Sequence, residues 1–199
     1  MISIILPYNK DRGYLAHALN SIDRQTYKDI EVIQSFSPNS VGYNLNEGIK
    51  KAKGDLITYI CDDDMLPPNA IEDTVNNFKG DFIHGNALNF RADGHRKLQV
   101  PTKLNPTLND MLNKNFVHGG TVTYHARCFE NDLFDESLTT GEEYEFNLRL
   151  LSKGFKLEYI NKLLYLYRRH EAQKSLGNED AEYIKARRKK INLIKDRFR

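Results

Sequence analysis

Short apolar runs alternate with amphipathic stretches along the N-terminal part of the chain. The apolar runs predict buried strands over Ile2–Leu6, Ile30–Ile33, Leu56–Cys61 and Asp81–His84. Between them, apolar residues recur at helical spacing, which predicts helices over Tyr14–Gln25, Val41–Lys53 and Pro68–Phe78. We expect Gly54 to cap the end of the second helix. Strands and helices that alternate in this way predict parallel βαβ units in an α/β layered fold.

The second half of the chain has a less regular pattern. Asn86–Lys103 predicts a hairpin or an exposed excursion, with its turn at residues 92–95. Beyond it, the pattern predicts a strand over Thr121–Tyr124, a helix over Glu142–Lys153 and a strand over Leu157–Tyr167. Ala181–Arg199 predicts a basic helix whose apolar stripe consists of Ile184, Ile191 and Ile194. We expect this helix to pack on the domain edge, and contact with anionic lipid is the alternative.

Composition narrows the function classes. The 199 residues suffice for one well-cored domain, and 40% apolar with 28% charged residues is ordinary for a globular protein. The net charge of +2 gives no basis for binding nucleic acid. Two distant cysteines, Cys61 and Cys128, indicate a reducing compartment. No basic leader precedes the first strand and no apolar run is long enough to span a bilayer, so we expect a cytoplasmic protein.

Three consecutive carboxylates, Asp62-Asp63-Asp64, follow the third predicted strand. Isolated charges at the end of a buried strand lose solvation, and a hard divalent cation is the usual compensation. Pro7-Tyr8-Asn9 ends the first strand, and ligands of open parallel sheets bind beyond these carboxyl ends. The alternative is a solvated acidic turn that caps the helix near Pro68.

The ordered set of segments resembles the inverting glycosyltransferases of family 2. The segments are ISIILPYNKDRGYLAHALNSIDRQTYKDIEVI, NEGIKKAKGDLITYICDDDMLPP, HGGTVTYHARCFE, TGEEYEFNLRLLSKGFKLEYI and LYLYRRHEAQKS. The resemblance runs from Ile2 to about Ser175. It implies a GT-A-type nucleotide-diphospho-sugar transferase fold, with a mostly parallel central sheet flanked by helices, over residues 1–178. Residues 179–199 would form the basic C-terminal helix.

The resemblance also implies a donor site with a divalent metal, Mn²⁺ or Mg²⁺. Aligned on Pro68, Asp63 and Asp64 take the last two positions of the family's acidic motif and would hold the metal, with His170 completing its shell. Cys61 stands where the first acid is usual, so Asp62 would supply the ribose contact. The remaining residues implied in binding the nucleotide sugar are Pro7, Tyr8, Asn9, Asn46, Gly120 and Arg168.

An inverting transfer needs a general base for the acceptor hydroxyl. The family's Gly-Glu-Asp segment reads Gly141-Glu142-Glu143 here, so Glu143 would be the base and Glu142 its substitute. An acidic helix N-terminus that suits the helix dipole is the simpler explanation. Gly119-Gly120 would let the backbone approach a sugar closely, or form a plain turn.

Two departures bear on the donor and on activity. Relatives carry a base-contacting Asp after the second strand, whereas Gln34–Ser40 has no carboxylate, so a uridine diphosphate sugar is only weakly favoured. Asn44-Leu45-Asn46 lacks the usual basic residue. A nucleotide-sugar-binding protein without transfer activity is therefore one alternative. A nucleotidyltransferase is another, although Lys10–Gly13 is a poor phosphate loop. The acceptor would be a glycan, a lipid carrier or a small molecule, recognised by Asn86–Lys114 or by a partner.

Overall fold

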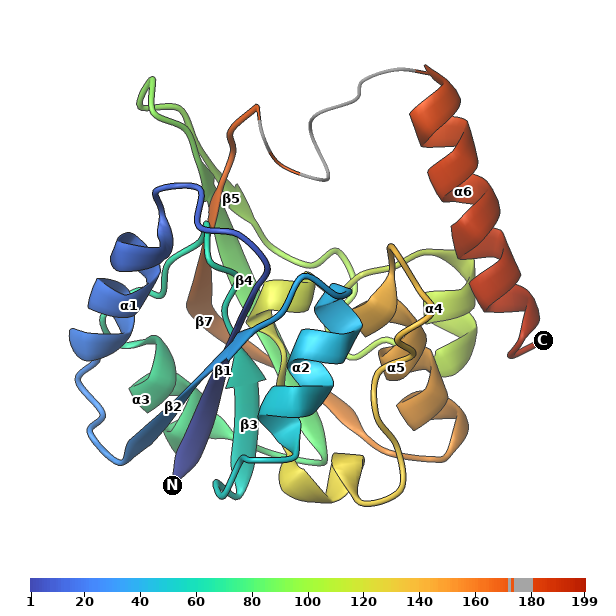
Figure 1. Ribbon diagram of the computed structural model, residues 1–199. Coiled ribbons are helices and arrows are strands. Elements are labelled where there is room, and N and C mark those ends of the chain that lie inside the picture. Colours follow the sequence, from blue (N-terminus) through green and yellow to red (C-terminus); the bar gives the residue numbers. More distant parts are fainter. Residues whose placement is uncertain (172, 174–180) are drawn as a thin grey trace.

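The computed structural model describes residues 1–171, residue 173 and residues 181–199 (Figure 1). The expected boundary at residues 178 and 179, and the end of the family resemblance near Ser175, lie outside the described residues. The strands are β1 (Ile2–Tyr8), β2 (Ile30–Phe36), β3 (Leu56–Tyr59), β4 (Phe82–Phe90), β5 (Arg96–Gln99), β6 (Thr123–His125) and β7 (Leu157–Arg168). The α-helices are α1 (Leu15–Asp23), α2 (Val41–Ile49), α3 (Ala70–Asn77), α4 (Leu108–Asn113), α5 (Glu142–Ser152) and α6 (Ala181–Asp196). Two short 3₁₀ helices are η1 (Gly119–Thr121) and η2 (Ala126–Phe129).

A seven-stranded, mostly parallel sheet organises the fold, as the sequence predicts. Its strand order is β2-β1-β3-β6-β4-β5, and β7 pairs with β4. β1 is parallel to β2 and β3, and β4 is parallel to β7. β6 is antiparallel to both β3 and β4, and β5 is antiparallel to β4. The carboxyl ends of β1, β2, β3, β4 and β7 therefore lie at the same edge of the sheet.

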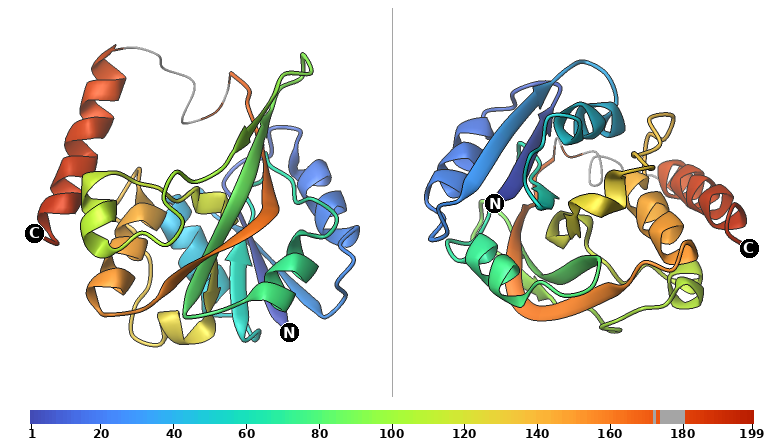
Figure 2. Two further views of the ribbon diagram at one scale, coloured as in Figure 1. Left: turned by 180° about the vertical axis from the view of Figure 1, so that it is seen from behind. Right: turned by 90° about the horizontal axis from the view of Figure 1, so that it is seen from below.

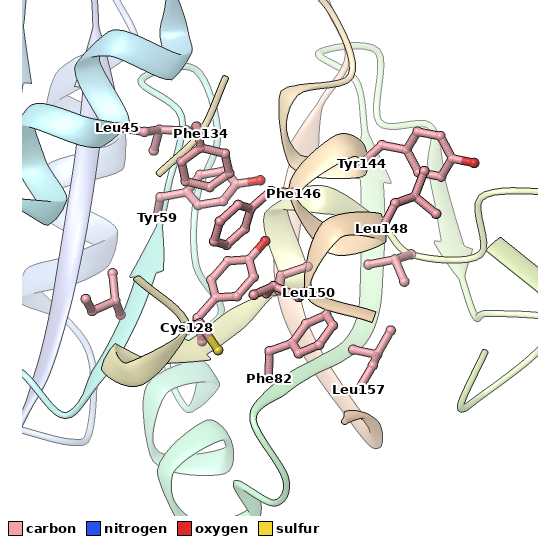
Figure 3. Packing of buried hydrophobic residues seen from close by; sticks show 14 of the residues in the cluster. Leu45, Tyr59, Phe82, Cys128, Phe134, Tyr144, Phe146, Leu148, Leu150 and Leu157 are labelled. Atoms are coloured by element: carbon pink, nitrogen blue, oxygen red, sulfur yellow. The ribbon is translucent and has the colours of Figure 1, made fainter. Parts of the chain in front are cut away.

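Helices cover both faces of the sheet (Figure 2). One face buries Ile2, Ile4 and Leu6 of β1 against α1 and α3, because alternate residues of a strand point to the same side. The other face packs on α2 and α5, and its aromatic centre is shown in Figure 3. There the ring of Phe146 lies 4.7 Å from that of Phe134 and 5.4 Å from that of Tyr124.

Some elements differ from the sequence predictions for identifiable reasons. β4 continues to Phe90, well past the expected end at His84, because its second half pairs with both β5 and β7. α4 was not predicted, although Thr107 and Asp110 form a complete capping box at its start. The role expected of Gly54 is wrong: α2 ends at Ile49 with Lys50 as its cap. Gly54 instead lies against Ser3, whose backbone nitrogen a Cβ would approach to 2.6 Å.

The basic helix α6 packs on the main core through its C-terminal half. Ile194 is 1% exposed and Ile191 packs on the main core, whereas Ile184 is 41% exposed. Gly141 makes room for this contact, because a Cβ would lie 2.8 Å from Ile191 Cδ1 and its φ of +79° favours glycine. Among the helices that the structure describes, none combines the length and apolar character that crossing a bilayer requires.

Candidate functional site

The acidic segment 62–64 lies where β1, β3 and β7 end. β1 has β2 on one side and β3 on the other, with α1 and α2 on opposite faces, so the crevice between β1 and β3 is the topological switch point of the sheet. Met65 and Leu166 exchange backbone hydrogen bonds of 3.0 and 2.9 Å, which fix the acidic segment against β7. The structure thus brings residues from the beginning, middle and end of the chain to one place.

Asp64 is held by β7. Its side chain is 1% exposed, and its Oδ2 accepts a hydrogen bond of 2.7 Å from the Tyr165 hydroxyl. Its Oδ1 accepts one of 2.8 Å from the Arg168 backbone N–H. Burial, together with the neighbouring charge of Asp63, raises the pKa of Asp64 well above its ordinary value. These two hydrogen bonds fix the carboxylate in position, and the nearby charge of Arg168 only partly offsets the effect of burial on its pKa.

Asp63 faces His170 across the candidate metal site. The Asp63 Oδ2 and His170 Nε2 atoms are 3.0 Å apart. One ligand atom each from Cys61, Asp63 and Asp64 lie within 4.8 Å of one another. Burial raises the pKa of the Cys61 thiol well above its ordinary value, and the two aspartates contribute carboxylate oxygens to the group. Oxygen ligands of this kind suit Mn²⁺ or Mg²⁺.

Asp62 has a partner that the sequence did not reveal. Its Oδ2 lies 3.4 Å from Arg12 Nη1, and the other guanidinium nitrogen donates to Asn9 Oδ1 at 3.3 Å. Asp62 is 7% exposed, and burial and Asp63 raise its pKa while Arg12 opposes the shift. The loop after β1 therefore supplies a cation to the acidic segment. Only the spacing of Arg12 from the end of the first strand could have indicated this.

Arg168 braces the acidic segment. Its Nε donates to the Asp63 carbonyl oxygen at 2.8 Å. Its guanidinium lies between the rings of Tyr14 and Phe90, 4.6 and 4.8 Å from their centroids. Its Nη2 is 3.3 Å from His17 Nδ1. The family resemblance implies that Arg168 binds the donor. The structure brings Arg168 to the carboxyl edge of the sheet, and the contacts described above join its side chain to other residues of the protein.

The glycine pair Gly119-Gly120 lies between the acidic start of α5 and the tyrosine that holds Asp64. A Cβ on Gly119 would lie 2.5 Å from the Glu143 Oε1 atom, so the glycine accommodates this carboxylate. A Cβ on Gly120 would lie 2.5 Å from the Tyr165 ring, so Gly120 serves the packing of the tyrosine that holds Asp64. The charge of Glu143 contributes to raising the pKa of Cys61, which places Glu143 electrostatically near the acidic segment. Glu142 is 5% exposed.

Two of the remaining predicted donor residues have structural contacts. Pro7 is buried, and Tyr8 lies with its ring 5.1 Å from that of Phe36. Asn46 is 1% exposed, and its Nδ2 donates to the Phe134 carbonyl oxygen at 2.9 Å and to Glu136 Oε1 at 2.8 Å. Both amide hydrogens of Asn46 are thus used within the protein, which leaves no donor for the expected contact with a nucleotide sugar.

His118 is a site-adjacent residue that sequence reasoning missed. Its ring lies 5.6 Å from that of Tyr165 and 5.1 Å from that of Tyr167. Its Nδ1 atom is buried without a hydrogen-bond partner among the described residues. Burial lowers the pKa of His118 to about 4, so its ring is neutral near pH 7.

Residues 37–136 match the model of glycosyl transferase family 2. The chain belongs to this family. An uncharacterised glycosyltransferase of Rickettsia bellii is 27% identical over 238 residues, which cover 100% of the chain and 33% of the relative. Glycosyltransferase GlyA of Streptococcus pneumoniae is 24% identical, over 84% of the chain and 30% of the relative. The chain therefore spans about a third of the length of these glycosyltransferases.

Solved structures of glycosyltransferases share the fold. S. aureus TarS 1–349 in complex with UDP-GlcNAc superposes with a TM-score of 0.73 and 15% identity, covering 97% of this chain and 66% of TarS. The mannosyltransferase PcManGT from Pyrobaculum calidifontis, in complex with GDP-Man and Mn²⁺, gives a TM-score of 0.59 and 11% identity, over 88% of this chain and 58% of PcManGT. The family 2 chain therefore has the GT-A-type α/β fold that its sequence predicts.

Proposed function

We propose that this family 2 protein is a metal-dependent inverting hexosyltransferase. It would move a sugar from a nucleotide-diphosphate donor to a hydroxyl group of a glycan, a lipid carrier or a small molecule. The observation that carries the proposal is the arrangement around the end of β3: an acidic segment on the β1 side and a glutamate, Glu143, across Gly119 on the other. This arrangement supports a diphosphate site and a general base on either side of one reaction centre.

The residues present fit a divalent cation. Asp63 and His170 would hold it, with Asp64 as a further carboxylate ligand. Fixation of Asp64 by Tyr165 and Arg168 uses one lone pair on each oxygen and leaves the others available. When bound, the cation supplies Lewis-acid stabilisation of the departing diphosphate. Mn²⁺ is our proposed metal, because PcManGT was solved with it and has the same fold.

The donor would lie along the carboxyl edge of β1 and β3. Pro7, Tyr8 and Asn9 would face the nucleoside, and Asp62 would contact its ribose. Arg168, anchored on the acidic segment, would orient its last free donors toward the diphosphate. The complexes of TarS with UDP and UDP-GlcNAc support a uridine nucleotide, and that of PcManGT with GDP-Man supports a guanosine nucleotide. We favour UDP as the donor nucleotide.

Glu143 would take the proton of the attacking hydroxyl on the face opposite the diphosphate, which inverts the anomeric centre. Gly119 leaves room for its carboxylate. Glu142 is the substitute base. Acceptor recognition would fall to Asn86–Lys114, whose hairpin projects beyond the carboxyl edge of the sheet (Figure 1), or to a partner. We place the enzyme in the cytoplasm, with α6 available for peripheral contact with anionic lipid.

Calorimetry tests the metal and donor site. Wild type is expected to bind UDP in the presence of Mn²⁺ and to lose most of this affinity without the metal. Asp63→Ala should lose metal-dependent binding, whereas the matched control Asp93→Ala, at the exposed tip of the hairpin, should bind like wild type. Metal-independent binding, or binding to neither UDP nor GDP, would contradict the proposal.

Glu143→Gln tests the base and separates transfer from binding alone. Because an amide cannot accept the proton, this variant should bind donor normally while transfer falls by at least about 100-fold. Glu142→Gln is the matched control and should retain transfer. Full activity of Glu143→Gln together with loss in Glu142→Gln would reverse the assignment. Donor binding by wild type without transfer to any acceptor would favour the alternative, a nucleotide-sugar-binding protein, for which Cys61 and the missing base-contacting Asp argue.

A further inference from the structure

Basic side chains gather on two elements that project from the body of the protein. One is the hairpin segment 88–104, which holds the end of β4 and all of β5, and the other is α6 with its last residues, 181–199. Together they hold twelve of the chain's 29 Lys and Arg residues but only three of its 27 Asp and Glu residues. The rest of the chain therefore carries a net negative charge, although the whole chain has a net charge of +2.

The same two elements carry exposed apolar side chains. Nine large apolar side chains are exposed among the described residues, and five of them lie here: Leu98, Val100 and Leu104 after the hairpin turn, and Ile184 and Leu193 on α6. Binding a polyanion in water needs charge alone. Basic side chains interleaved with apolar ones are instead typical of a surface that enters the headgroup region of a bilayer.

The N-terminal half of α6 extends away from the core. Residues 184–190 are all exposed, whereas Ile194 in the next turn is 1% exposed. Lys185, Arg188 and Lys189 share one side of the helix by their spacing, and that side lies opposite Ile194. The C-terminal half thus anchors the helix, and the N-terminal half presents a basic face to solvent.

Both elements flank the candidate site. The hairpin leaves the body at Phe90, whose ring lies 4.8 Å from the guanidinium of Arg168, and Arg168 in turn binds the acidic segment. α6 passes beside Gly141, where a Cβ would lie 2.8 Å from Ile191 Cδ1, and Glu143 follows two positions later. Both elements project beyond the carboxyl edge of the sheet, which is uppermost in Figure 1 and in the left view of Figure 2. A flat surface that touches both elements therefore also faces the site.

We propose that the hairpin and the N-terminal half of α6 dock this protein on an anionic lipid bilayer, with the carboxyl edge of the sheet facing the headgroups. The negative surface potential of such a bilayer attracts the basic side chains, and the exposed apolar side chains enter the headgroup region. The same potential repels the acidic remainder of the chain, which favours this one orientation. The inference rests on the proposed function in one respect: it selects the lipid carrier among the acceptor classes, because the site then opens onto the membrane surface.

Co-sedimentation with vesicles tests the docking. Wild type should bind vesicles of equal parts phosphatidylcholine and phosphatidylglycerol, and should bind phosphatidylcholine alone far more weakly. Added salt should release the protein, because it screens exposed charges. Two variants each remove two charges: Arg96→Gln with Lys97→Gln on the hairpin, and Lys185→Gln with Lys189→Gln on α6. A basic side chain near an anionic surface contributes roughly fivefold to binding, so each variant should bind roughly 25-fold more weakly.

A charge control and an apolar variant complete the vesicle test. Lys51→Gln with Lys53→Gln is the matched control and should bind like wild type, because these exposed lysines precede β3 at the amino edge of the sheet. Leu98→Ser with Ile184→Ser should weaken binding to the mixed vesicles by roughly tenfold or more. If this variant binds like wild type, the surface recognises charge alone, which refutes the bilayer in favour of a soluble polyanion. If either charge variant binds like the control, docking through both elements is refuted.

Calorimetric binding of UDP with Mn²⁺ separates this inference from the proposed function. The charge variants and the apolar variant should bind UDP like wild type, because the substituted residues lie outside the proposed donor site, and this binding also shows that they fold. If wild type binds UDP but not the mixed vesicles, the docking is refuted and the donor site stands. If wild type binds the vesicles but no nucleotide, the proposed function fails and the docking stands.

Discussion

The glycine pair beside the acidic segment gives a sharp prediction, because its two members face different neighbours. Neither Gly119 nor Gly120 has a positive φ, so alanine introduces no backbone strain at either position. The added methyl group alone decides the outcome. At Gly120 it would lie 2.5 Å from two atoms of the Tyr165 ring, and at Gly119 it would lie 2.5 Å from the end of the Glu143 side chain.

Gly120→Ala should destabilise the protein. Tyr165 is 1% exposed, and its hydroxyl both donates to Asp64 and accepts the Cys61 N–H at 3.1 Å, so the ring cannot retreat without loosening both bonds. Overpacking of a buried site costs about 1–3 kcal/mol, and a weakened hydrogen bond adds about 1 kcal/mol. We therefore expect a loss of about 3 kcal/mol, which for a chain of this length lowers the Tm by roughly 6–12 °C.

Gly119→Ala should affect the stability of the protein less than Gly120→Ala does, but it should slow the transfer reaction. The methyl group would lie 2.5 Å from Oε1 and 2.6 Å from Cγ of Glu143, and this side chain can rotate whereas the fully buried Tyr165 ring cannot, so the free energy of unfolding should fall less than in Gly120→Ala. A general base displaced by about 1 Å is expected to cost about 100-fold in transfer rate. Urea unfolding followed by circular dichroism, together with a transfer assay, measures both quantities. Equal stability of the two variants, or greater destabilisation by Gly119→Ala, would refute the steric argument.

Three further predictions concern stability. His118 titrates near pH 4 when folded and near 6.5 when unfolded, so wild type should lose about 2–3 kcal/mol of stability as pH falls from 6.5 to 4, and His118→Gln should lose less. Arg149→Met should cost about 3–5 kcal/mol, because it leaves Glu145, which is 4% exposed, without its ion-pair partner. Asn46→Ala should cost about 2–4 kcal/mol by leaving the Phe134 backbone unpaired. Urea unfolding measures all three.

Each of these predictions has an outcome that contradicts it. Equal pH dependence in wild type and His118→Gln would show that His118 is solvated. Lys153→Met is the control for Arg149→Met, because Lys153 pairs with Asp132 from a more exposed position. Its loss of stability should be less than about 1 kcal/mol. A larger loss in Lys153→Met than in Arg149→Met would contradict the prediction. If Asn46→Ala leaves stability unchanged but weakens UDP binding, Asn46 is a ligand-binding residue as its sequence position predicts.

Local patterns predicted the strands and helices that precede the site. The apolar run before Asp62 and the helical spacing after Gly13 depend only on near neighbours, so β3 and α1 were identified to within two residues. α4 could also have been predicted, because Thr107 and Asp110 have the spacing of a capping box. The extent of β4 could not, because it depends on pairing with strands that follow later in the chain.

The chemistry of the site was predictable where the relevant residues are adjacent in sequence. The facing of Asp63 and His170 was expected only through the family resemblance, since 107 positions separate them. Arg12, whose role depends on the path of a loop, gave no periodic or compositional signal. Asn46 shows the converse: its position suggested a ligand contact, and the fold uses its amide to hold residues 134–136.

The hydrogen bonds that hold Asp64 have a consequence for biosynthesis. Its partners Tyr165 and Arg168 follow it by 101 and 104 positions. At about 5–20 residues per second, a ribosome needs roughly 5–20 seconds to make the intervening chain. During that interval the nascent carboxylates remain in water, and they are fixed in place only when β7 joins β4. The acidic residues are therefore positioned only after synthesis has passed β7, because a shorter nascent polypeptide has these residues without the strand that holds them.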